Sequence, residues 1–412
     1  MRRQASRGCA VQPAPTLLVG YASLAFSKTI PEEPKVPGLL PNVDPDGLLE
    51  YSVVYTDRSL NHMSAAFQGV MRDISRILKA VYHAEAAVIV PGGGTFGMEA
   101  VARQFATGKK CLVIRNGWFS YRWSQIFEMG SIPAATTVLK ARRLAAAPQS
   151  PFAPAPIEEV VATIRAEKPD LVFAPHVETA SGMLLPDAYL RAVAAAVHAH
   201  GGLFVLDCVA SGALWVDMAE IGVDILVTAP QKGWSGPPCG ALVCLGAEAL
   251  SHMDATTSTS FAADLKKWLQ IMQAYEAGGH AYHATLPTDA LVALRKVMLE
   301  AEAHGFEKLR TAQSELGAKV RKLLAARGFK SVAAPGFEAP GVVVCYTDDP
   351  EIQSARKFIA QGLQTAAGVP LQCDEPADFR SFRVGLFGLD KLYAVDRTVA
   401  TLETALDKVL AG

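Results

Sequence analysis

The sequence has no long hydrophobic run, no excess of charge of either sign and no paired cysteines, and each absence excludes a class of protein. A membrane span needs about 20 consecutive apolar residues, and the longest candidate, residues 17–26, is about half as long. The 39 basic and 40 acidic residues give a formal net charge of -1. The sequence therefore predicts no nucleic-acid partner and no membrane partner, and a small-molecule partner is expected instead.

The cysteines and the N-terminus bear on location. The seven cysteines are odd in number, include no C-x-x-C pair and mostly lie in apolar runs, as buried reduced thiols do. We therefore expect a cytoplasmic protein without disulfides. The first thirty residues contain Arg2, Arg3, Arg7 and Lys28 but no acidic residue, so an organelle presequence stays open beside an extended N-terminal arm.

The middle of the chain predicts an α/β fold. From residue 86 onward, short β-branched runs alternate with longer amphipathic stretches, which is typical of strand-helix-strand units and a mostly parallel sheet. The helices expected between the strands are residues 96–106, 157–167 and 186–200. The seven expected strands are residues 86–90, 111–115, 135–139, 171–176, 203–208, 225–230 and 241–245.

The pattern changes after residue 287, which predicts a second and smaller α/β domain. We expect an arm or presequence over 1–50, a large domain over 51–286 and a small C-terminal domain over 287–412. The elements expected in the small domain are a long helical segment, a strand at 341–346, a helix near 350–366, a strand within 382–388 and a closing helix at 390–410.

A glycine run, PGGGTFGMEA at 91–100, lies between an expected strand and an expected helix. Glycines allow the backbone to approach a ligand closely, and a helix N-terminus presents free N–H groups to a phosphate. The run also satisfies the G-x-G-x-x-G pattern of a nicotinamide oxidoreductase. However, the next strand ends in Asn116-Gly117, where ribose binding requires Asp or Glu.

Two strand ends carry an acid and an amine. Asp207 ends the strand at 203–208, and Lys232 follows the strand at 225–230. Ligands of open α/β sheets bind outside the carboxyl ends of the strands. A structural salt bridge is one interpretation of this pair. Together with a phosphate-binding turn, the pair instead predicts pyridoxal 5'-phosphate, which needs an amine for a Schiff base and an acid at its ring nitrogen.

Five ordered motifs make this prediction specific. From about residue 50 to its end, the chain resembles the class V aminotransferases, and within them the alanine/serine–glyoxylate aminotransferase group. The resemblance implies a fold-type I pyridoxal phosphate enzyme, with a seven-stranded mostly parallel sheet in the large domain, a small C-terminal α/β domain and a homodimer. The motifs are HVETASG (176–182), LDCVASG (206–212), TAPQKG (228–233), YHAT (282–285) and FRVGLFG (382–388).

The resemblance also implies roles for individual residues. Lys232 would form the internal aldimine and move the substrate proton, and Asp207 would pair with the ring nitrogen. Thr179 would lie near the cofactor O3', with Val209 under one ring face. The implied phosphate contacts are Gly93, Gly94, Thr95 and Gln231 from one chain, and Tyr282 and Thr285 from the partner chain.

The remaining implied roles concern the second ring face and the substrate. Phe119 would cover the other ring face, with Trp118 as the alternative, and Arg383 would grip the substrate α-carboxylate. The implied reaction is ping-pong transamination of a small amino acid with a 2-oxo acid such as glyoxylate or pyruvate. The family's Gly-Pro-Gly-Pro loop is replaced by residues 38–48, and one of its serines is Ala210, so the substrate pocket is expected to differ.

Other functions stay open. A pyridoxal phosphate lyase or cysteine desulfurase shares this fold, and Cys373 would be its sulfur acceptor. Desulfurases, however, have histidines where this chain has Gln231 and Phe119. A nicotinamide oxidoreductase and a binding protein without catalysis are further alternatives. No metal site is expected, because no H-E-x-x-H motif or carboxylate cluster accompanies His280 and His283.

Overall fold

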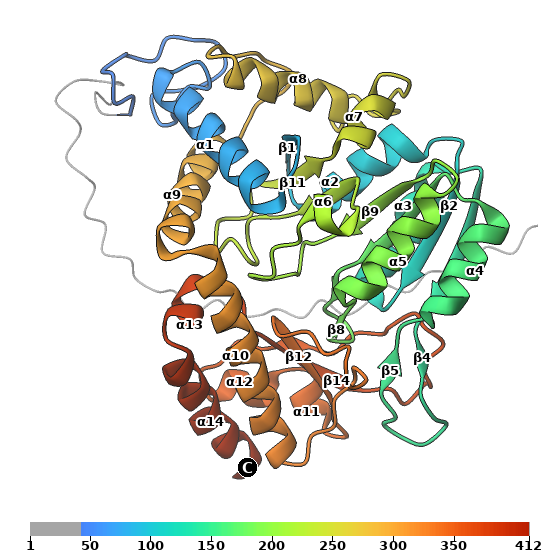
Figure 1. Cartoon of the computed structure of the whole chain (residues 1–412). Coiled ribbons are helices and arrows are strands. Elements are labelled where there is room, and N and C mark those ends of the chain that lie inside the picture. The colour runs from blue at the N-terminus through green and yellow to red at the C-terminus, as the bar shows by residue number, and fades with distance from the viewer. Residues whose placement is uncertain (1–42, 412) are drawn as a thin grey trace, which may run out of the picture. The chain divides into compact units, whose positions relative to one another are not determined.

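A seven-stranded sheet with the order β1-β11-β10-β9-β6-β2-β3 is the largest element of the computed structural model (Figure 1). The structure describes residues 43–411, so the expected presequence and residues 38–42 of the altered loop lie outside the described residues. All seven expected strands are confirmed. They are β1 (Ala86–Pro91), β2 (Lys110–Arg115), β3 (Ala135–Lys140), β6 (Leu171–Pro175), β9 (Leu203–Asp207), β10 (Ile225–Thr228) and β11 (Gly240–Leu245).

One strand departs from the parallel arrangement. The pairs from β10 through β9, β6 and β2 to β3 are parallel, whereas β11 runs antiparallel to both β10 and β1. Parallel neighbours need a long crossover, usually a helix, and residues 229–239 between β10 and β11 contain none. The apolar run of β11 is buried at every residue, as the parallel strands β6 and β9 are, so only the short connection before it indicates its direction.

Helices pack against the sheet and bury its strands. The expected helix 157–167 is confirmed as α4 (Ile157–Glu167), 186–200 contains α5 (Asp187–His198), and 96–106 contains α2 (Gly94–Val101) followed by a π-helical turn (Ala102–Ala106). β6 and β9 are buried at every residue, as expected of strands covered on both faces. The other helices here are α1 (Ala65–Tyr82), α3 (Trp118–Gly130), α6 (Met218–Ile221), α7 (Ala247–Met253) and α8 (Leu265–Glu276).

The C-terminal elements surround a second sheet, with the order β12-β14-β13. In Figure 1 most of them gather below the larger sheet, whereas α9 lies beside α1 and α10 runs down toward the small sheet. The elements are α9 (Thr288–His304), α10 (Phe306–Ala326), β12 (Val342–Tyr346), α11 (Pro350–Gln353), α12 (Arg356–Ala360), β13 (Ala366–Ala367), β14 (Ser381–Gly385), α13 (Leu389–Tyr393) and α14 (Val395–Ala411). Short pairs elsewhere are β4 (Arg142–Arg143) with β5 (Phe152–Ala153) and β7 (Val177–Glu178) with β8 (Met183–Leu184).

Two helices predicted in this part as continuous are each divided into two shorter helices. The segment 350–366 holds two short helices, because Ala355 adopts a left-handed conformation with φ 64°, which ends a right-handed helix. The closing helix is interrupted at Ala394, with φ -141° and ψ 62°. Neither break coincides with a glycine or proline that the sequence could have shown.

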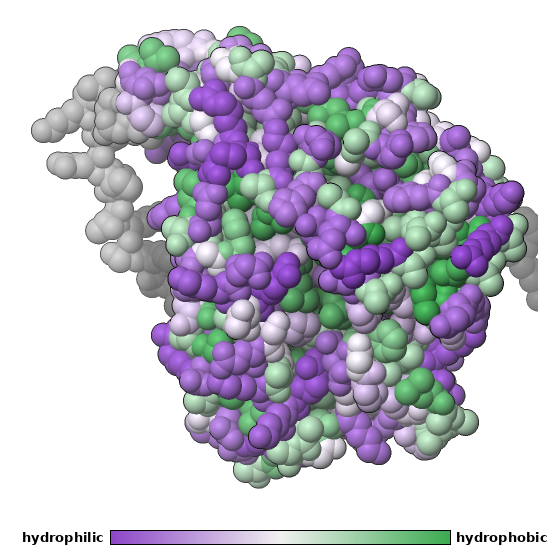
Figure 2. Space-filling view, in the orientation of Figure 1, coloured by the Kyte–Doolittle hydropathy of each residue, from purple (hydrophilic) through white to green (hydrophobic). Residues whose placement is uncertain are grey.

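Apolar residues form the buried core of the described chain, as its composition predicts. The larger apolar cluster joins the strands of the main sheet to α1, α8, α9 and α10, and both sheets belong to one compact unit that spans Leu40–Gly412. Hydrophilic and apolar residues are interspersed over the face in Figure 2. Within residues 43–411, no helix combines the length and hydrophobicity that a bilayer crossing requires.

Candidate active site

Asp207 and Lys232 lie at adjacent strand ends of the main sheet. Asp207 is the last residue of β9, and Val227 of β10 is its partner in the parallel register, so the chain leaving β10 toward Lys232 starts at the same edge. Both side chains line one cavity of about 440 Å³, a size suited to a small-molecule ligand. They form no ion pair with each other, which argues against a structural salt bridge.

The glycine turn can pack against the segment after β9, at the edge of this cavity, because its glycines carry no side chain that would clash there. Gly93 is the N-cap of α2, and Gly94 and Thr95 line the cavity. A Cβ added at Gly94 would lie 2.7 Å from Cγ2 of Val209, in the segment that follows β9. The start of α2 therefore packs directly on the segment after Asp207, and only glycine fits there.

Phe119 and Val209 both line the cavity, as expected of residues that would cover two faces of one ring. Phe119 lies in the first turn of α3, and Thr179 lines the cavity from the turn between β7 and β8. Trp118 lies outside the lining and packs beside Tyr121, with ring centroids 5.9 Å apart. The geometry therefore favours Phe119 over Trp118.

Burial shifts the pKa of the acid and of the amine in opposite directions. It raises the pKa of Asp207 to about 7, although the N–H of Val209 donates to its Oδ1 at 2.9 Å and Arg122 lies near. Burial lowers the pKa of the Lys232 amine, and the positive charge of Arg383 lowers it further. Both groups are therefore easier to neutralise than in water, which is typical of catalytic groups.

Arg383 enters the cavity from the small sheet. It lies on β14, its Nε donates to the carbonyl of Ala367 at 2.8 Å, and its guanidinium carbon lies 5.6 Å from the ring centroid of Phe119. Burial lowers its pKa. Gln231 also lines the cavity, and its buried Oε1 has no hydrogen-bond partner within residues 43–411.

Tyr282 and Thr285 contact each other outside this cavity. The Tyr282 hydroxyl lies 3.2 Å from Oγ1 of Thr285, and 55% of Tyr282 is exposed. Neither residue lines the cavity of its own chain. Their expected contact with a partner subunit's cofactor stays a prediction.

Glu178 is a residue whose role sequence reasoning missed. Its buried carboxylate accepts hydrogen bonds from the N–H groups of Phe119 (3.3 Å), Ser120 (2.8 Å) and Ala180 (2.9 Å), and from the Ser120 hydroxyl (2.7 Å). It thus ties the first turn of α3 to the turn that carries Thr179, and burial raises its pKa. An acid inside the HVETASG motif was the available signal.

Arg122 and Phe387 also line the cavity without having been predicted. Arg122 follows Phe119 by three residues on α3, and that spacing places both on one helix face, which was a usable signal. Phe387 lies with its ring centroid 5.6 Å from Nζ of Lys232. It belongs to the FRVGLFG motif, but the motif alone gave no reason to place its ring against the amine.

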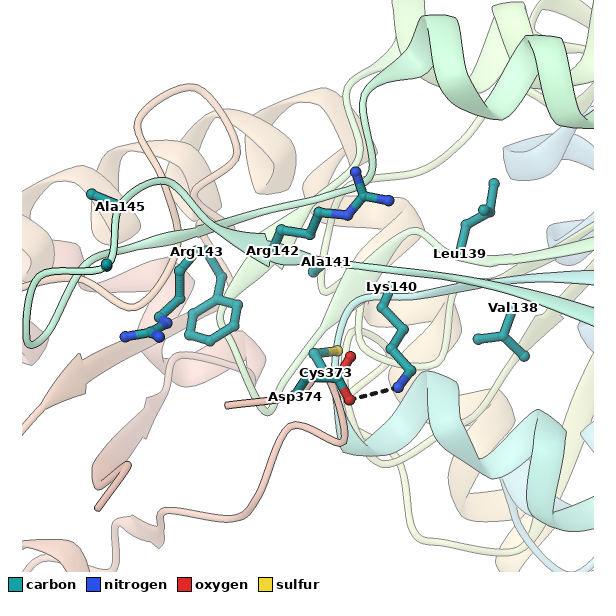
Figure 3. A pocket seen from close by; sticks show the side chains of 11 residues that line it. Val138, Leu139, Lys140, Ala141, Arg142, Arg143, Ala145, Cys373 and Asp374 are labelled. Atoms are coloured by element: carbon teal, nitrogen blue, oxygen red, sulfur yellow. Dashed lines mark hydrogen bonds and ion pairs between the residues drawn. The ribbon is translucent and has the colours of Figure 1, made fainter. Parts of the chain in front are cut away.

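Cys373 lies away from this site. It lines another cavity, of about 500 Å³, beside the ion pair of Lys140 with Asp374 (Figure 3). Its buried Sγ donates to the carbonyl of Arg115 at 3.4 Å, and burial raises its pKa to about 12. A protonated, enclosed thiol outside the Lys232 cavity is a poor sulfur acceptor, so this observation weakens the desulfurase alternative.

The donor set of the Lys232 cavity suits pyridoxal phosphate. An amine of lowered pKa can bind an aldehyde, a buried carboxylate can hold a protonated ring nitrogen, and apolar side chains can enclose a ring. Gly94, Thr95 and Gln231 line the same cavity, where the N–H groups of the helix start, the Thr95 hydroxyl and Nε2 of Gln231 can donate to a phosphate.

Gly233 fixes the backbone next to Lys232, and we expect Gly233→Ala to displace it. A Cβ at Gly233 would lie 2.0 Å from the carbonyl oxygen of Gly212, so the backbone must move. We expect a loss of about 1–3 kcal/mol in the free energy of unfolding, together with weaker cofactor binding, as measured by denaturant titration and absorbance.

The matched control is Gly69→Ala, in the interior of α1. Nothing lies within 4 Å of a Cβ at that position, so the same substitution is expected to stabilise the helix by about 0.5–1 kcal/mol. Equal effects of the two substitutions would contradict the close contact at Gly233.

Known relatives are distant in sequence but cover most of the chain. The "soluble hydrogenase, small subunit" of Synechococcus sp. (strain PCC 6716) is 25% identical over 356 residues, 85% of this chain and 87% of that protein. The 2-aminoethylphosphonate–pyruvate transaminase 2 of Paraburkholderia xenovorans is 27% identical over 359 residues, 86% and 90%. Alanine–glyoxylate aminotransferase 1 of Saccharomyces cerevisiae is 27% identical over 267 residues, 61% and 66%.

The fold is that of solved aminotransferases. The structure of alanine–glyoxylate aminotransferase from Nostoc sp. has a TM-score of 0.69 at 21% identity, covering 84% of this chain and 89% of that one. The model of the class-V aminotransferase family matches residues 47–378. This match spans the main sheet, the Lys232 cavity except for its last strand, and most of the C-terminal elements, and the chain therefore belongs to the class-V aminotransferases.

Proposed function

We propose that this enzyme transfers the amino group of a small amino acid to a 2-oxo acid such as glyoxylate or pyruvate, with pyridoxal 5'-phosphate as cofactor. The observation that carries the proposal is the placement of Lys232, Asp207 and Arg383 around one cavity. The names of the relatives support the acceptors, because one relative is a pyruvate transaminase and another a glyoxylate aminotransferase.

The chain's own residues would divide the work. Lys232 Nζ would hold the cofactor covalently, and the same amine would accept and return the proton of the donor Cα. Its lowered pKa keeps more of the amine neutral and able to accept that proton. Asp207 holds the ring nitrogen through a charge-assisted hydrogen bond. When bound, the cofactor ring supplies an acceptor for the electrons left on the substrate carbon.

The phosphate end of the cavity would be completed by a second subunit. In this proposal Gly93, Gly94, Thr95 and Gln231 hold the phosphate from one chain. Tyr282 and Thr285 would reach it from the partner of a homodimer. Their exposure, and the exposure of Thr95 at the cavity, support such an arrangement.

Two further predictions accompany this proposal. The division into a large domain over 51–286 and a small domain over 287–412 agrees with the separate sheets of the two regions. The six described cysteines are buried free thiols, which supports the predicted cytoplasmic location.

The substrate end favours a small, uncharged donor side chain. Arg383 would bind the α-carboxylate through its planar guanidinium. Around it, the cavity is lined by Val342, Ala366, Gly385 and Phe387. These four residues carry no positive charge, and Arg122, which also lines the cavity, is bonded to Thr95 at the glycine turn, so a second carboxylate beside Arg383 would be buried unpaired at a cost.

The half-reaction with an amino donor tests this function. We expect alanine, serine or glycine, added alone to the cofactor-loaded enzyme, to replace the visible absorption of the bound aldehyde with that of the aminated cofactor. Glyoxylate or pyruvate should then restore the first spectrum. If every small amino acid leaves the spectrum unchanged, the proposed transamination is wrong; release of sulfide from cysteine would instead support the lyase alternative.

A further inference from the structure

Arg122 is a cavity-lining arginine that forms no ion pair among residues 43–411, although its charge lowers the pKa of the nearby Asp207 carboxyl. Its described side-chain hydrogen bond runs from NH1 to Oγ1 of Thr95, at 2.9 Å. By contrast, Arg76, Arg103 and Arg142 each pair with a glutamate. A guanidinium that faces a ligand cavity unpaired is typical of an anion-binding site.

Two arginines flank Phe119. The guanidinium carbon of Arg122 lies 5.3 Å from the ring centroid of Phe119, and that of Arg383 lies 5.6 Å from it. One cation is bonded to Thr95 at the glycine turn, and the other is bonded to Ala367 on the small sheet. The cavity thus has two cationic groups, and a cofactor with a bound amino acid has two anionic groups, a phosphate and an α-carboxylate.

The glycine turn itself supplies few side-chain donors. Positions 92–94 are all glycine, so Thr95 provides the hydroxyl of this turn. Because the Thr95 oxygen accepts a hydrogen bond from Arg122, its own hydrogen is directed elsewhere and is free to be donated to a phosphate oxygen. The remaining N–H groups of Arg122 can approach the same anion.

We propose that Arg122 is a phosphate-recognition residue of this enzyme, which orients the Thr95 hydroxyl and places a positive charge at the phosphate end of the cavity. The inference rests on the proposed cofactor. It assigns to Arg122 the discrimination between the phosphorylated cofactor and its unphosphorylated form, and leaves the substrate carboxylate to Arg383.

The test compares binding of two ligands to the full chain freed of cofactor. Pyridoxal 5'-phosphate and pyridoxal share the ring and the aldehyde and differ only in the phosphate. We expect Arg122→Gln to weaken binding of pyridoxal 5'-phosphate by about tenfold to a hundredfold, and binding of pyridoxal by less than about threefold. Arg122→Lys keeps the positive charge but not the planar guanidinium, so its affinity for pyridoxal 5'-phosphate should lie between those of the native enzyme and Arg122→Gln.

Two further measurements keep the proposal falsifiable. Inorganic phosphate should compete with pyridoxal 5'-phosphate for the native chain at lower concentration than for Arg122→Gln. A Thr95→Val variant should also weaken binding of pyridoxal 5'-phosphate. Because Arg122 and Thr95 are hydrogen-bonded to each other, the double variant should lose less affinity than the product of the two single fold-losses.

The control is Arg142→Gln, which removes an arginine that is paired with Glu159 and lines the cavity in Figure 3; it should leave both affinities unchanged. Equal losses for both ligands would reduce Arg122 to a structural role and overturn the inference. So would native affinity in Arg122→Gln, or an effect confined to the KM of a dicarboxylic substrate. If the native chain binds neither ligand, the proposed cofactor itself fails.

Discussion

Lys232→Ala is expected to abolish both transamination and the visible absorption of the purified enzyme. In the proposed reaction the amine is both the nucleophile and the base, and no other residue that lines the cavity is an amine that could replace it. We expect the rate to fall by about 10⁴-fold or more, the upper range for loss of a general base alone. Absorbance spectra and single-turnover rates measure the two effects separately.

A lysine outside the cavity provides the control for this result. Lys140 pairs with Asp374 at 2.7 Å in the other cavity, shown in Figure 3, and Lys140→Ala should keep both the spectrum and the rate. If Lys232→Ala retained the native rate with the donor and acceptor that the native enzyme uses, the assignment of Lys232 would be wrong.

Asp207→Asn is expected to have two opposite effects, a loss of activity and a gain in stability of the cofactor-free chain. The amide cannot hold a protonated ring nitrogen as a carboxylate does, so we expect a fall in rate of about 10²-fold or more. At the same time, burial raises the pKa of Asp207 to about 7, which means that its charged form destabilises the fold.

The sign of the pH dependence follows from proton binding. Between about pH 4 and 7, the native state holds a proton on Asp207 that the unfolded state has released, so stability falls as pH rises through this window. Asp207→Asn removes that loss. In urea titrations, the variant should exceed the native chain by about 1–4 kcal/mol at pH 8, and the difference should shrink toward pH 4.

Asp217 offers a control of opposite sign. It accepts the N–H of Glu220 and lies 2.6 Å from Nδ1 of His83, and despite partial burial its pKa is lowered by these partners. Its charged form therefore stabilises the fold, and Asp217→Asn should lower stability at neutral pH. A stability gain in both variants would contradict the reasoning for Asp207.

The sequence predicted the site best where a reactive side chain directly follows an expected strand. Asp207 and Lys232 were placed together because each follows a buried apolar run, and all seven runs are strands of one sheet. The direction of β11 could not be taken from the apolar runs themselves, because fully buried strands look alike whether parallel, as β6 and β9 are, or antiparallel; the signal was the short connection without a helix between β10 and β11. The break at Ala355 was hidden as well, since nothing in the identity of an alanine indicates a left-handed conformation.

Glu178 and Arg122 were missed for a different reason. Each acts through groups distant in sequence: Glu178 accepts the N–H groups of the α3 start, and Arg122 donates to a hydroxyl on α2. The local sequence pattern indicates the helix or strand on which a residue lies. It does not indicate which residue of another element the side chain contacts. The roles carried over from the family motifs likewise stay predictions until they are tested.

A line of contacts through Gly233, Gly212 and Gln313 joins the segment of Lys232 to α10. A Cβ at Gly212 would lie 2.6 Å from Oε1 of Gln313, whose Nε2 donates to the carbonyls of Pro340 and Leu386, which lie together where β12 begins and β14 ends. The segment that carries Lys232 is therefore packed against Gly212 with no side chain between the two main chains, and Gly212 in turn packs against Gln313 of α10. A side chain at either glycine would therefore push the segment of Lys232 away from the helix that packs on the small sheet, and with it from the strand that carries Arg383.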